Sequence, residues 1–422
     1  MMRLFATQSE YADRIAAAVE AENRCVRQVR GFIDQISSQQ GKIVALEEEK
    51  QRLDAKNAQL TTQIEDLEGR KSRTVSQPIA AVVIMSCNRA DYLERTITSV
   101  LRYHVPFASK FPLFISQDGD DKSVRMKARS FYQFSHMQHI DPDPPKSNHP
   151  GENIAYYKIA RHYKWALTQL FDKQNFQRVI ILEDDMEISL DFFDYFEATA
   201  PLLDQDSSLV AVSSWNDNGQ KQFVQDPELL YRSDFFPGLG WMLTKTFWAE
   251  LSPKWPKAYW DDWLRLKENR KGRQFIRPEV CRTYNFGEHG SSYGQFFKQY
   301  LETIKLNDVL VPWKSKNLSY LLEGEFQKQF AALVQNSVPI AANEAAKAYN
   351  IDGDVRIEYE SQSAFQNLAK QFGIFEEWKD GIPRTAYKGV VVIRWQTSRR
   401  IFLVASDSLL QLGISMDRVA RT

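Results

Sequence analysis

The sequence of 422 residues has few cysteines and no long hydrophobic run, and each absence excludes a class of protein. Its three cysteines are too few and too scattered for a disulfide framework or a zinc site. No window approaches 18 consecutive apolar residues, the length that a membrane-spanning helix needs. The first residues also lack the apolar core of a signal peptide. The sequence as given therefore predicts no membrane-spanning segment.

The charges are balanced, with 54 Lys and Arg residues against 54 Asp and Glu residues. Nucleic acids and anionic membranes attract proteins with a basic excess, so we expect no nucleic acid partner. The sequence contains neither a Walker-type phosphate loop nor a GxGxxG motif, which argues against a P-loop kinase or a dinucleotide-dependent oxidoreductase. Aromatic residues, in contrast, are abundant at 13%.

Residues 9–73 are predicted to form one long helix, because they are rich in Glu, Gln, Lys and Ala and contain no proline. Two sets of mostly apolar residues recur there at seven-residue intervals, which is the period of a coiled coil. We call these two sets the heptad columns. The columns are Leu46, Leu53, Leu60 and Leu67, and Ile36, Ile43, Lys50, Asn57 and Ile64. We expect a homodimer through this stem, and a single solvated helix is the alternative. A polar run before Pro78 predicts a linker, so residues 1–78 form the stem and linker.

The body of the chain begins with a buried strand and then alternates strands with helices. Four short apolar runs predict strands, at residues 79–86, 111–116, 178–182 and 209–213, and residues 155–171 have helical periodicity. Strands that are apolar on both faces predict an α/β fold with a mostly parallel sheet covered by helices. Ligands of such folds bind at the carboxyl ends of the strands. Polar clusters follow three of these strands: Asn88-Arg89, Gln117-Asp118 and Glu183-Asp184-Asp185.

The three adjacent carboxylates of Glu183, Asp184 and Asp185 predict a metal site. Neighbouring carboxylates repel one another, so their folding is costly unless a cation offsets the charge. Mg²⁺ and Mn²⁺ bind carboxylate oxygens together with substrate phosphates, and a diphosphate held in this way is a good leaving group. An exposed acidic turn before a helix is the alternative.

Residues 215–263 hold six of the ten tryptophans, together with several carboxylates and amides. Aromatic faces beside hydrogen-bonding groups are typical of a sugar site. Asp261 and Asp262 lie between two of these tryptophans, and partial desolvation there is expected to make one of them basic enough to accept a hydroxyl proton. The alternative is that most of these rings are ordinary core, which is favoured for Trp248 and Trp255.

Two further segments complete the organisation of the chain. Residues 286–294 (FGEHGSSYG) contain three glycines and are expected to form a mobile loop that closes over a diphosphate, with a plain surface turn as the alternative. After a connector at 301–323, residues 324–416 are predicted to form a smaller α+β unit, followed by a tail at 417–422. KGVVVIRW and IFLVA in that unit predict a β-hairpin.

Several strings resemble one enzyme family, N-acetylglucosaminyltransferase I, in its plant form. They are SQDG, YYKIARHYKWAL, VIILEDDMEI, SSWNDNG, LYRSDFFPGLGWML, PKWPKAYWDDW and FGEHGSSYGQFF, and the resemblance runs from residue 79 to near residue 415. It implies a GT-A fold (a Rossmann-like nucleotide-sugar transferase) over residues 79–300, with a donor-closing loop at 286–300. The implied reaction is an inverting, Mn²⁺-dependent transfer of N-acetylglucosamine from UDP-GlcNAc. The implied acceptor is the α1,3-arm mannose of the five-mannose N-glycan on glycoproteins, and the product linkage is β1,2.

The resemblance also implies a role for individual residues. Arg89, Asp118 and His162 match contacts to the uridine nucleotide, and Asp118 would read the uracil edge. Asp184 matches a contact to the donor sugar or the ribose, and Glu183 and Trp260 match residues beside the donor sugar. Ser292 matches a contact to the diphosphate. Asp185 matches the one direct protein ligand of Mn²⁺, while Asp261 matches the catalytic base.

The sequence departs from the animal enzymes of this family at their paired cysteines. The partner of Cys87 is replaced by Gly119, and a second pair corresponds to Ala211 and Phe275, so Cys87 is expected to be a free thiol near the nucleotide. Glu288-His289 replaces a basic pair, which puts any cationic help from that loop in doubt. Asn317 lies in the only usable glycosylation sequon.

The resemblance further implies a single-pass type II protein of the Golgi membrane with a luminal catalytic domain, which starts complex and hybrid N-glycan synthesis. Family members carry a signal anchor ahead of the stem, and we expect that anchor to be missing from the chain as given. Three alternatives stay open. They are a metal-dependent nucleotidyltransferase, a coiled-coil tether with an inactive transferase fold, and a related β1,2-transferase that acts on O-linked mannose.

Overall fold

The computed structural model describes residues 2–69, 77–143, 145, 153–345, 351–394 and 399–414. The chain divides into two compact units, Met1–Ser76 and Gln77–Thr422. Among the described residues, no helix combines the length and the apolar character needed to span a bilayer.

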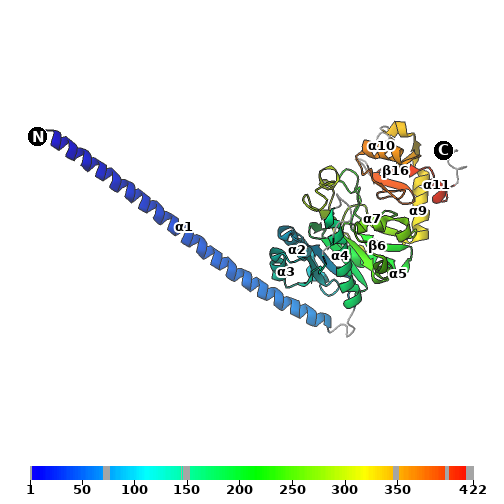
Figure 1. The fold of residues 1–422 in the computed structure, drawn as a ribbon, viewed down its shortest axis with the longest axis horizontal. Helices are drawn as coiled ribbons and strands as arrows, with labels where there is room; N and C mark the ends of the chain where they lie inside the picture. The colour runs from blue at the N-terminus through cyan, green and yellow to red at the C-terminus, as the bar shows by residue number, and fades with distance from the viewer. Residues whose placement is uncertain are drawn as a thin grey trace. The chain divides into compact units, whose positions relative to one another are not determined.

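The first unit is a single continuous helix, α1 (Met2–Gly69), drawn in blue in Figure 1. The predicted helix is confirmed, although it begins earlier and ends at Gly69, and the linker that follows lies mostly outside the described residues. The heptad side chains that the structure describes are exposed in the single chain, including Ile36 at 59% and Leu46 at 65%. The unit therefore carries a row of apolar side chains that its own chain does not cover.

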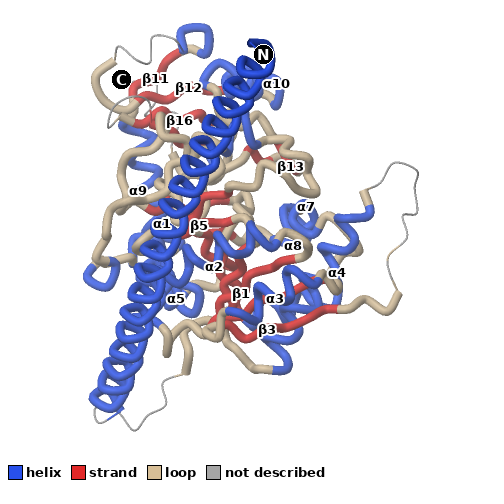
Figure 2. The backbone as a smooth tube through the Cα atoms, turned by 90° about the vertical axis from the view of Figure 1, so that its left-hand side faces the viewer, coloured by secondary structure: helices blue, strands red, loops and turns tan. Residues whose placement is uncertain are grey.

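The second unit is built on an eight-stranded sheet with the order β3-β2-β1-β4-β8-β6-β9-β7 (Figure 2). The strands are β1 (Ala81–Ser86), β2 (Leu113–Asp118), β3 (Phe134–His139), β4 (Arg178–Glu183), β6 (Leu209–Ser213), β7 (Leu230–Ser233), β8 (Trp241–Thr244) and β9 (Gln274–Pro278). The four strands from β3 to β4 are parallel, and β8 then runs antiparallel to both β4 and β6. The four predicted strands are confirmed. Sequence reasoning missed β3 because this edge strand, FSHMQH, is mostly polar.

Alternate residues of β1 pack into different hydrophobic cores, which shows that both faces of the sheet are covered. Val82 and Ile84 belong to one core, while Ala81, Val83 and Met85 belong to the other. On the first face lie α2 (Ala90–His104), α3 (Lys122–Ser130) and α5 (Phe192–Gln205). On the second lie α4 (Ile154–Thr168), α6 (Lys245–Leu251) and α7 (Trp260–Arg265), and α8 (Lys267–Arg270) follows. The mixed α/β class predicted from the sequence is confirmed.

The last third of the chain adds a four-stranded sheet with the order β11-β12-β16-β15. Its elements are α9 (Glu323–Asn336), β11 (Val338–Ile340), β12 (Val355–Tyr359), α10 (Gln362–Phe372), β15 (Val390–Arg394), β16 (Arg400–Ala405) and α11 (Ser408–Gln411). Strands β15 and β16 are antiparallel, which confirms the predicted hairpin. Two small ribbons complete the unit, β5 (Met186–Ile188) with β10 (Thr283–Asn285), and β13 (Trp378–Lys379) with β14 (Ile382–Pro383).

A buried carboxylate, Asp191, joins the start of α5 to the connector that follows the glycine-rich loop. Asp191 and Arg282 are both fully buried, and their side chains form an ion pair of 3.1 Å. Asp191 also accepts hydrogen bonds from Trp313 Nε1 at 2.8 Å and from Asn307 Nδ2 at 2.9 Å. A buried charge is tolerated only when it is paired and hydrogen-bonded in this way. The connector is therefore held by polar contacts that have no access to water.

Replacement Asp191→Ala is expected to lower the free energy of unfolding by about 3–5 kcal/mol, because it leaves the Arg282 guanidinium buried without its partner. Urea denaturation followed by circular dichroism measures this. The matched control is Asp204→Ala, since that carboxylate also pairs with an arginine but is 56% exposed. The control is expected to cost about 1 kcal/mol or less. Equal losses in the two variants would contradict the role given to burial.

Candidate active site

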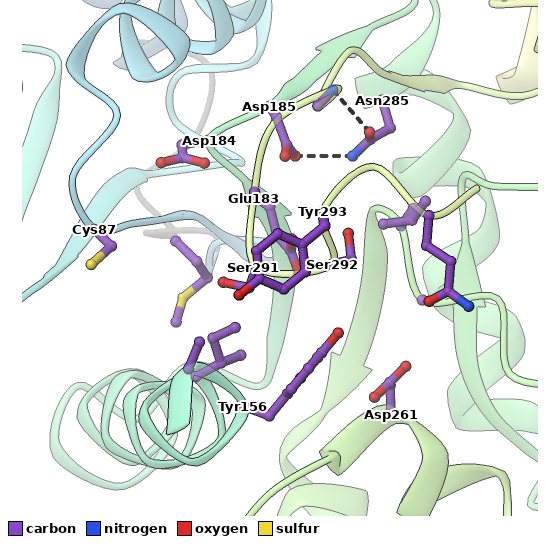
Figure 3. Close-up of a pocket in the computed structure, with 18 of the residues that line it drawn as sticks. Cys87, Tyr156, Glu183, Asp184, Asp185, Asp261, Asn285, Ser291, Ser292 and Tyr293 are labelled. Carbon is purple, nitrogen blue, oxygen red and sulfur yellow. Dashed lines mark hydrogen bonds between the residues drawn. The ribbon is translucent and has the colours of Figure 1, made fainter. Parts of the chain in front are cut away.

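A cavity of about 1000 Å³ opens at the carboxyl ends of β1, β2 and β4 (Figure 3). The parallel register places these strand ends side by side, with Met85 opposite Glu183 and Ser86 opposite Gln117. All the site residues predicted from the sequence line this one cavity. They are Arg89, Asp118, His162, Glu183, Asp184, Asp185, Trp260, Asp261 and Ser292.

Arg89, at the start of α2, partly neutralises the acidic cluster at the end of β4. Its guanidinium contacts Asp184 Oδ1 and lies 2.9 Å from Asp185 Oδ2. Burial raises the pKa of Asp184 to about 6, and the Arg89 charge opposes that rise. Burial, followed by the Asp185 charge, raises the pKa of Glu183 to about 7, and Tyr163 donates a hydrogen bond of 2.7 Å to that carboxylate. The positive charge of Arg89 is therefore not enough to balance three ionised carboxylates.

Asp185 is oriented by residues that sequence reasoning missed. Asn285, on β10, donates a hydrogen bond of 2.9 Å to Asp185 Oδ1, and Asn285 Oδ1 in turn accepts one from the Gly287 backbone (Figure 3). A Cβ atom on Gly287 would lie only 2.3 Å from Asp185 Oδ2. The absence of a side chain at Gly287 is therefore what lets the glycine-rich loop approach this carboxylate. The sequence alone held no signal that Asn285 would reach β4.

The donor set of the cavity fits a hard divalent cation held mainly by its substrate. Among the residues that the structure describes, no three His, Cys, Asp or Glu side chains converge to form a metal cage. Asp185, whose side chain is 9% exposed, contacts Arg89 and lies against the backbone of Gly287. A single carboxylate on the wall of the cavity suits Mg²⁺ or Mn²⁺, which complete their shells with phosphate oxygens and water.

The far end of the cavity has polar groups suited to a nucleotide base. Asp118 Oδ1 lies 2.7 Å from His139 Nδ1, and the His139 ring stacks on that of His162 with centroids 5.7 Å apart. His162 Nε2 lies 2.8 Å from Ser116 Oγ, and burial lowers the pKa of His162 to about 4, so this ring is neutral. Sequence reasoning missed His139, because it belongs to the unpredicted edge strand β3.

Asp261 lies at the start of α7, and its side chain is 41% exposed. Arg265 holds it in an ion pair of 3.0 Å. For Asp262 the predicted gain in basicity is wrong: burial raises its pKa, but the hydrogen bond from Lys379 and the Arg265 charge outweigh burial and lower it. Arg265 also pairs with Asp262 at 3.0 Å, and Lys379 of β13 contacts Asp262 at 2.7 Å. The position of Asp261 thus depends on a network that includes the last third of the chain.

Most of the clustered tryptophans belong to the core. Trp215, Trp241 and Trp248 are fully buried, and Trp255 is 8% exposed. Of the six, only Trp260 is among the described residues that line the cavity, where its ring stacks on Tyr163 at 4.4 Å. The interpretation of these rings as ordinary core is therefore right for Trp248 and Trp255 and extends to Trp215 and Trp241. Indole rings supply large apolar area against a sheet, and this packing explains their concentration.

The glycine-rich loop is attached to the body at several points. The His289 carbonyl accepts a hydrogen bond of 2.8 Å from Arg89, and Glu288 pairs with Lys298 at 3.2 Å. Beyond Ser292, the Tyr300 ring stacks on Phe375 with centroids 3.9 Å apart. The segment that contains Phe375 therefore packs against the residues that follow this loop, which the sequence did not indicate.

Cys87 lines the same cavity. It is surface-exposed and forms no disulfide, as predicted, and partial desolvation at the cavity wall, followed by the Asp118 charge, raises the pKa of the thiol. Ala211 and Phe275, the positions of the second animal pair, are direct partners on β6 and β9.

The cavity combines an end with polar groups suited to a nucleotide base, a carboxylate suited to a divalent cation, and a separate carboxylate at Asp261. This arrangement is typical of group transferases that move a substituent from a nucleotide diphosphate to an acceptor. Comparisons with known proteins identify the family. The model of the GNT-I family matches residues 1–416, so the chain belongs to the GNT-I family of glycosyltransferases.

A relative in Arabidopsis thaliana, alpha-1,3-mannosyl-glycoprotein 2-beta-N-acetylglucosaminyltransferase, is 64% identical over 418 residues, which cover 98% of this chain and 94% of the relative. Solved structures are less similar. The mannosyltransferase PcManGT of Pyrobaculum calidifontis, in complex with GDP-Man and Mn²⁺, is 15% identical over 55% of this chain and 64% of its own, with a TM-score of 0.34. S. aureus TarS 1-349 in complex with UDP-GlcNAc is 12% identical over 69% of this chain and 71% of its own, with a TM-score of 0.33. Scores this low carry no argument about ligand or mechanism.

Replacement Gly287→Ala is expected to displace the Asp185 carboxylate, because the added Cβ would lie 2.3 Å from Oδ2. We expect the affinity for Mn²⁺ in the presence of UDP to fall about 10-fold to 100-fold, the usual effect of disturbing the groups around a metal ligand. Calorimetric titration of UDP at several Mn²⁺ concentrations measures the change. Gly290→Ala is the control, since its Cβ would meet only the flexible Arg89 side chain, at 3.3 Å. Unchanged Mn²⁺ dependence in Gly287→Ala would show that Asp185 does not hold the metal.

Proposed function

We propose that this glycosyltransferase moves N-acetylglucosamine from UDP-GlcNAc to the α1,3-arm mannose of the five-mannose N-glycan, in β1,2 linkage and with inversion at the anomeric carbon. The fold expected for such an enzyme is GT-A. The observation that carries the proposal is the placement of Asp261 in the same cavity as Arg89, Asp118 and Asp185. The identity to the Arabidopsis relative supports the choice of donor, acceptor and linkage.

An inverting transfer needs one base beside the acceptor hydroxyl and no enzyme nucleophile. Asp261 takes the proton of the mannose 2-hydroxyl as that oxygen forms its bond to the anomeric carbon of the donor. The bond from this carbon to the diphosphate oxygen breaks, and its electron pair leaves with UDP. Arg265 holds Asp261 through Oδ2 at 3.0 Å, so we assign the proton to Oδ1.

The remaining residues hold the donor. Asp118 accepts from the uracil ring while His139 fixes its carboxylate, and neutral His162 lies beside the nucleoside. Arg89 and Ser292 lie on the path of the diphosphate, while Glu183, Asp184 and Trp260 border the sugar. Asp185 would hold Mn²⁺, and the chemistry that the bound ion would supply is neutralisation of the charge on the departing UDP.

Replacement Asp261→Asn is expected to lower kcat by about 10² to 10⁴-fold, the usual contribution of a general base. Binding of UDP-GlcNAc should be preserved, because the amide has nearly the same shape. Measurement of UDP release with Mn²⁺ and the five-mannose glycan tests the first point, and calorimetry tests the second. Asp262→Asn is the matched control on the same helix, and its kcat is expected to fall less. Near-normal turnover in Asp261→Asn would refute the assignment.

The same assay separates the other candidate functions. A nucleotidyltransferase would release pyrophosphate in place of UDP, and an inactive tether would release nothing with any acceptor. A transferase for O-linked mannose would prefer mannosyl peptides to the five-mannose glycan. UDP-galactose serves as the donor control.

We further propose that α1 pairs with a second copy of itself and forms the stem of a Golgi membrane protein whose catalytic unit is luminal. The exposed apolar side chains of the heptad columns support this pairing, since a second helix would cover Ile36, Ile43, Leu46 and Leu53. The polar residues Lys50 and Asn57 in one column favour a two-stranded register.

The double replacement of Leu46 and Leu53 by lysine is expected to convert a dimer of the full chain into a monomer, because it places charge in the apolar seam. Sedimentation equilibrium measures the mass directly. Ala45→Lys with Ala55→Lys adds the same charge on the opposite side of the helix and should leave the dimer intact. A monomeric unmodified chain at micromolar concentration would rule out the pairing.

A further inference from the structure

A second cavity, of about 520 Å³, lies between α8 and the sheet of the last third of the chain. Its wall is built from α8, from the segments that follow β12 and β16, and from the β13–β14 ribbon. None of the residues that line it also lines the active-site cavity. Neither the sequence patterns nor the proposed reaction gives it a role.

The lining of the second cavity suits a neutral, hydroxyl-rich ligand. It contains the partly buried ring of Trp378, which packs at right angles against Tyr359 with centroids 6.1 Å apart and is thereby held in place. Around this ring stand three basic residues (Lys267, Arg270 and Lys388) and four acidic residues (Asp234, Glu323, Glu360 and Asp407). Charges that nearly cancel do not attract a phosphate or a nucleotide, whereas donors and acceptors around an aromatic ring match the faces and hydroxyls of a sugar.

Arg270 adds a buried hydrogen-bond donor without a partner. The residue is 5% exposed, and its guanidinium lies 3.6 Å from Asp234 Oδ1. Among the described contacts, its Nε atom has no acceptor. A buried donor without an acceptor costs free energy, and proteins rarely keep one unless a water or a ligand satisfies it.

The β13–β14 ribbon connects the second cavity to the active site. Successive residues of a strand point to opposite sides, and β13 contains only Trp378 and Lys379. Trp378 lines the second cavity, while Lys379 Nζ contacts Asp262 Oδ2 at 2.7 Å, next to the base Asp261. At the tip of the ribbon, Asp380 accepts a hydrogen bond of 2.6 Å from the backbone of Lys267, at the start of α8. The ribbon thus lines the second cavity on one side and contacts Asp262 of the active site on the other.

We propose that the second cavity binds a terminal mannose on the other arm of the branched acceptor while the α1,3-arm mannose lies at Asp261. This inference rests on the proposed function, because it concerns the acceptor of that reaction. The second cavity then selects the branched glycan over a simple mannoside, and the last third of the chain acts in acceptor recognition.

The test compares two acceptors, the five-mannose glycan and methyl α-mannoside, in steady-state kinetics of the full chain with UDP-GlcNAc and Mn²⁺. Trp378→Ala removes the ring, and Ser406→Trp fills the cavity from an exposed position on its wall. We expect both variants to raise KM for the glycan about 10-fold, the loss typical of a removed aromatic anchor, with kcat preserved. The kinetics with methyl α-mannoside should not change.

Tyr132→Ala is the control for loss of an aromatic ring, because Tyr132 is 91% exposed and lines neither cavity. An unchanged KM for UDP-GlcNAc shows that each variant is folded. Ser406→Trp keeps the test decisive if Trp378→Ala does not fold. Absence of transfer by the unmodified chain to either acceptor would overturn the proposed function itself. If the unmodified chain transfers N-acetylglucosamine but the variants change KM for both acceptors equally, or for neither, only the role of the second cavity is overturned.

Discussion

The constraint on which the rest of the structure depends is the burial of three adjacent carboxylates at the end of β4. The register of β1 against β4 brings Arg89 to this cluster, and its guanidinium contacts both Asp184 and Asp185. One arginine does not balance three carboxylates, and burial raises the pKa values of Glu183 and Asp184. Asn285 closes over the site with a hydrogen bond to Asp185, and the proposed cation at Asp185 would offset the remaining charge.

The last third of the chain is joined to the active site by specific contacts. Lys379 holds Asp262 beside the proposed base Asp261, and Phe375 stacks on Tyr300 beyond the glycine-rich loop. A carboxylate that is 41% exposed, as in Asp261, needs such support to keep one position. The same ribbon carries Trp378 into the second cavity, so catalysis and acceptor recognition share one element.

Much of the site was predictable because it follows short apolar strands. Arg89, Asp118 and Asp185 come directly after or at the ends of runs that can only be buried strands, and parallel strands bring such ends together. Asn285, His139 and Lys379 were not predictable, because each reaches the site from a polar edge strand or a two-residue ribbon. The clustered tryptophans misled in part, since composition does not distinguish a ring in a core from a ring in a cavity.

The sequence by itself determined the long helix, the α/β class and the carboxylates that carry the proposed chemistry. These depend on local periodicity and on residue type, which can be read along the chain. Only the tertiary structure decided that Gly287 approaches Asp185, that Arg265 holds Asp261, and that Lys379 reaches Asp262. Those contacts join residues as far apart as Asp262 and Lys379, and their geometry depends on how the two sheets pack, which no local pattern records.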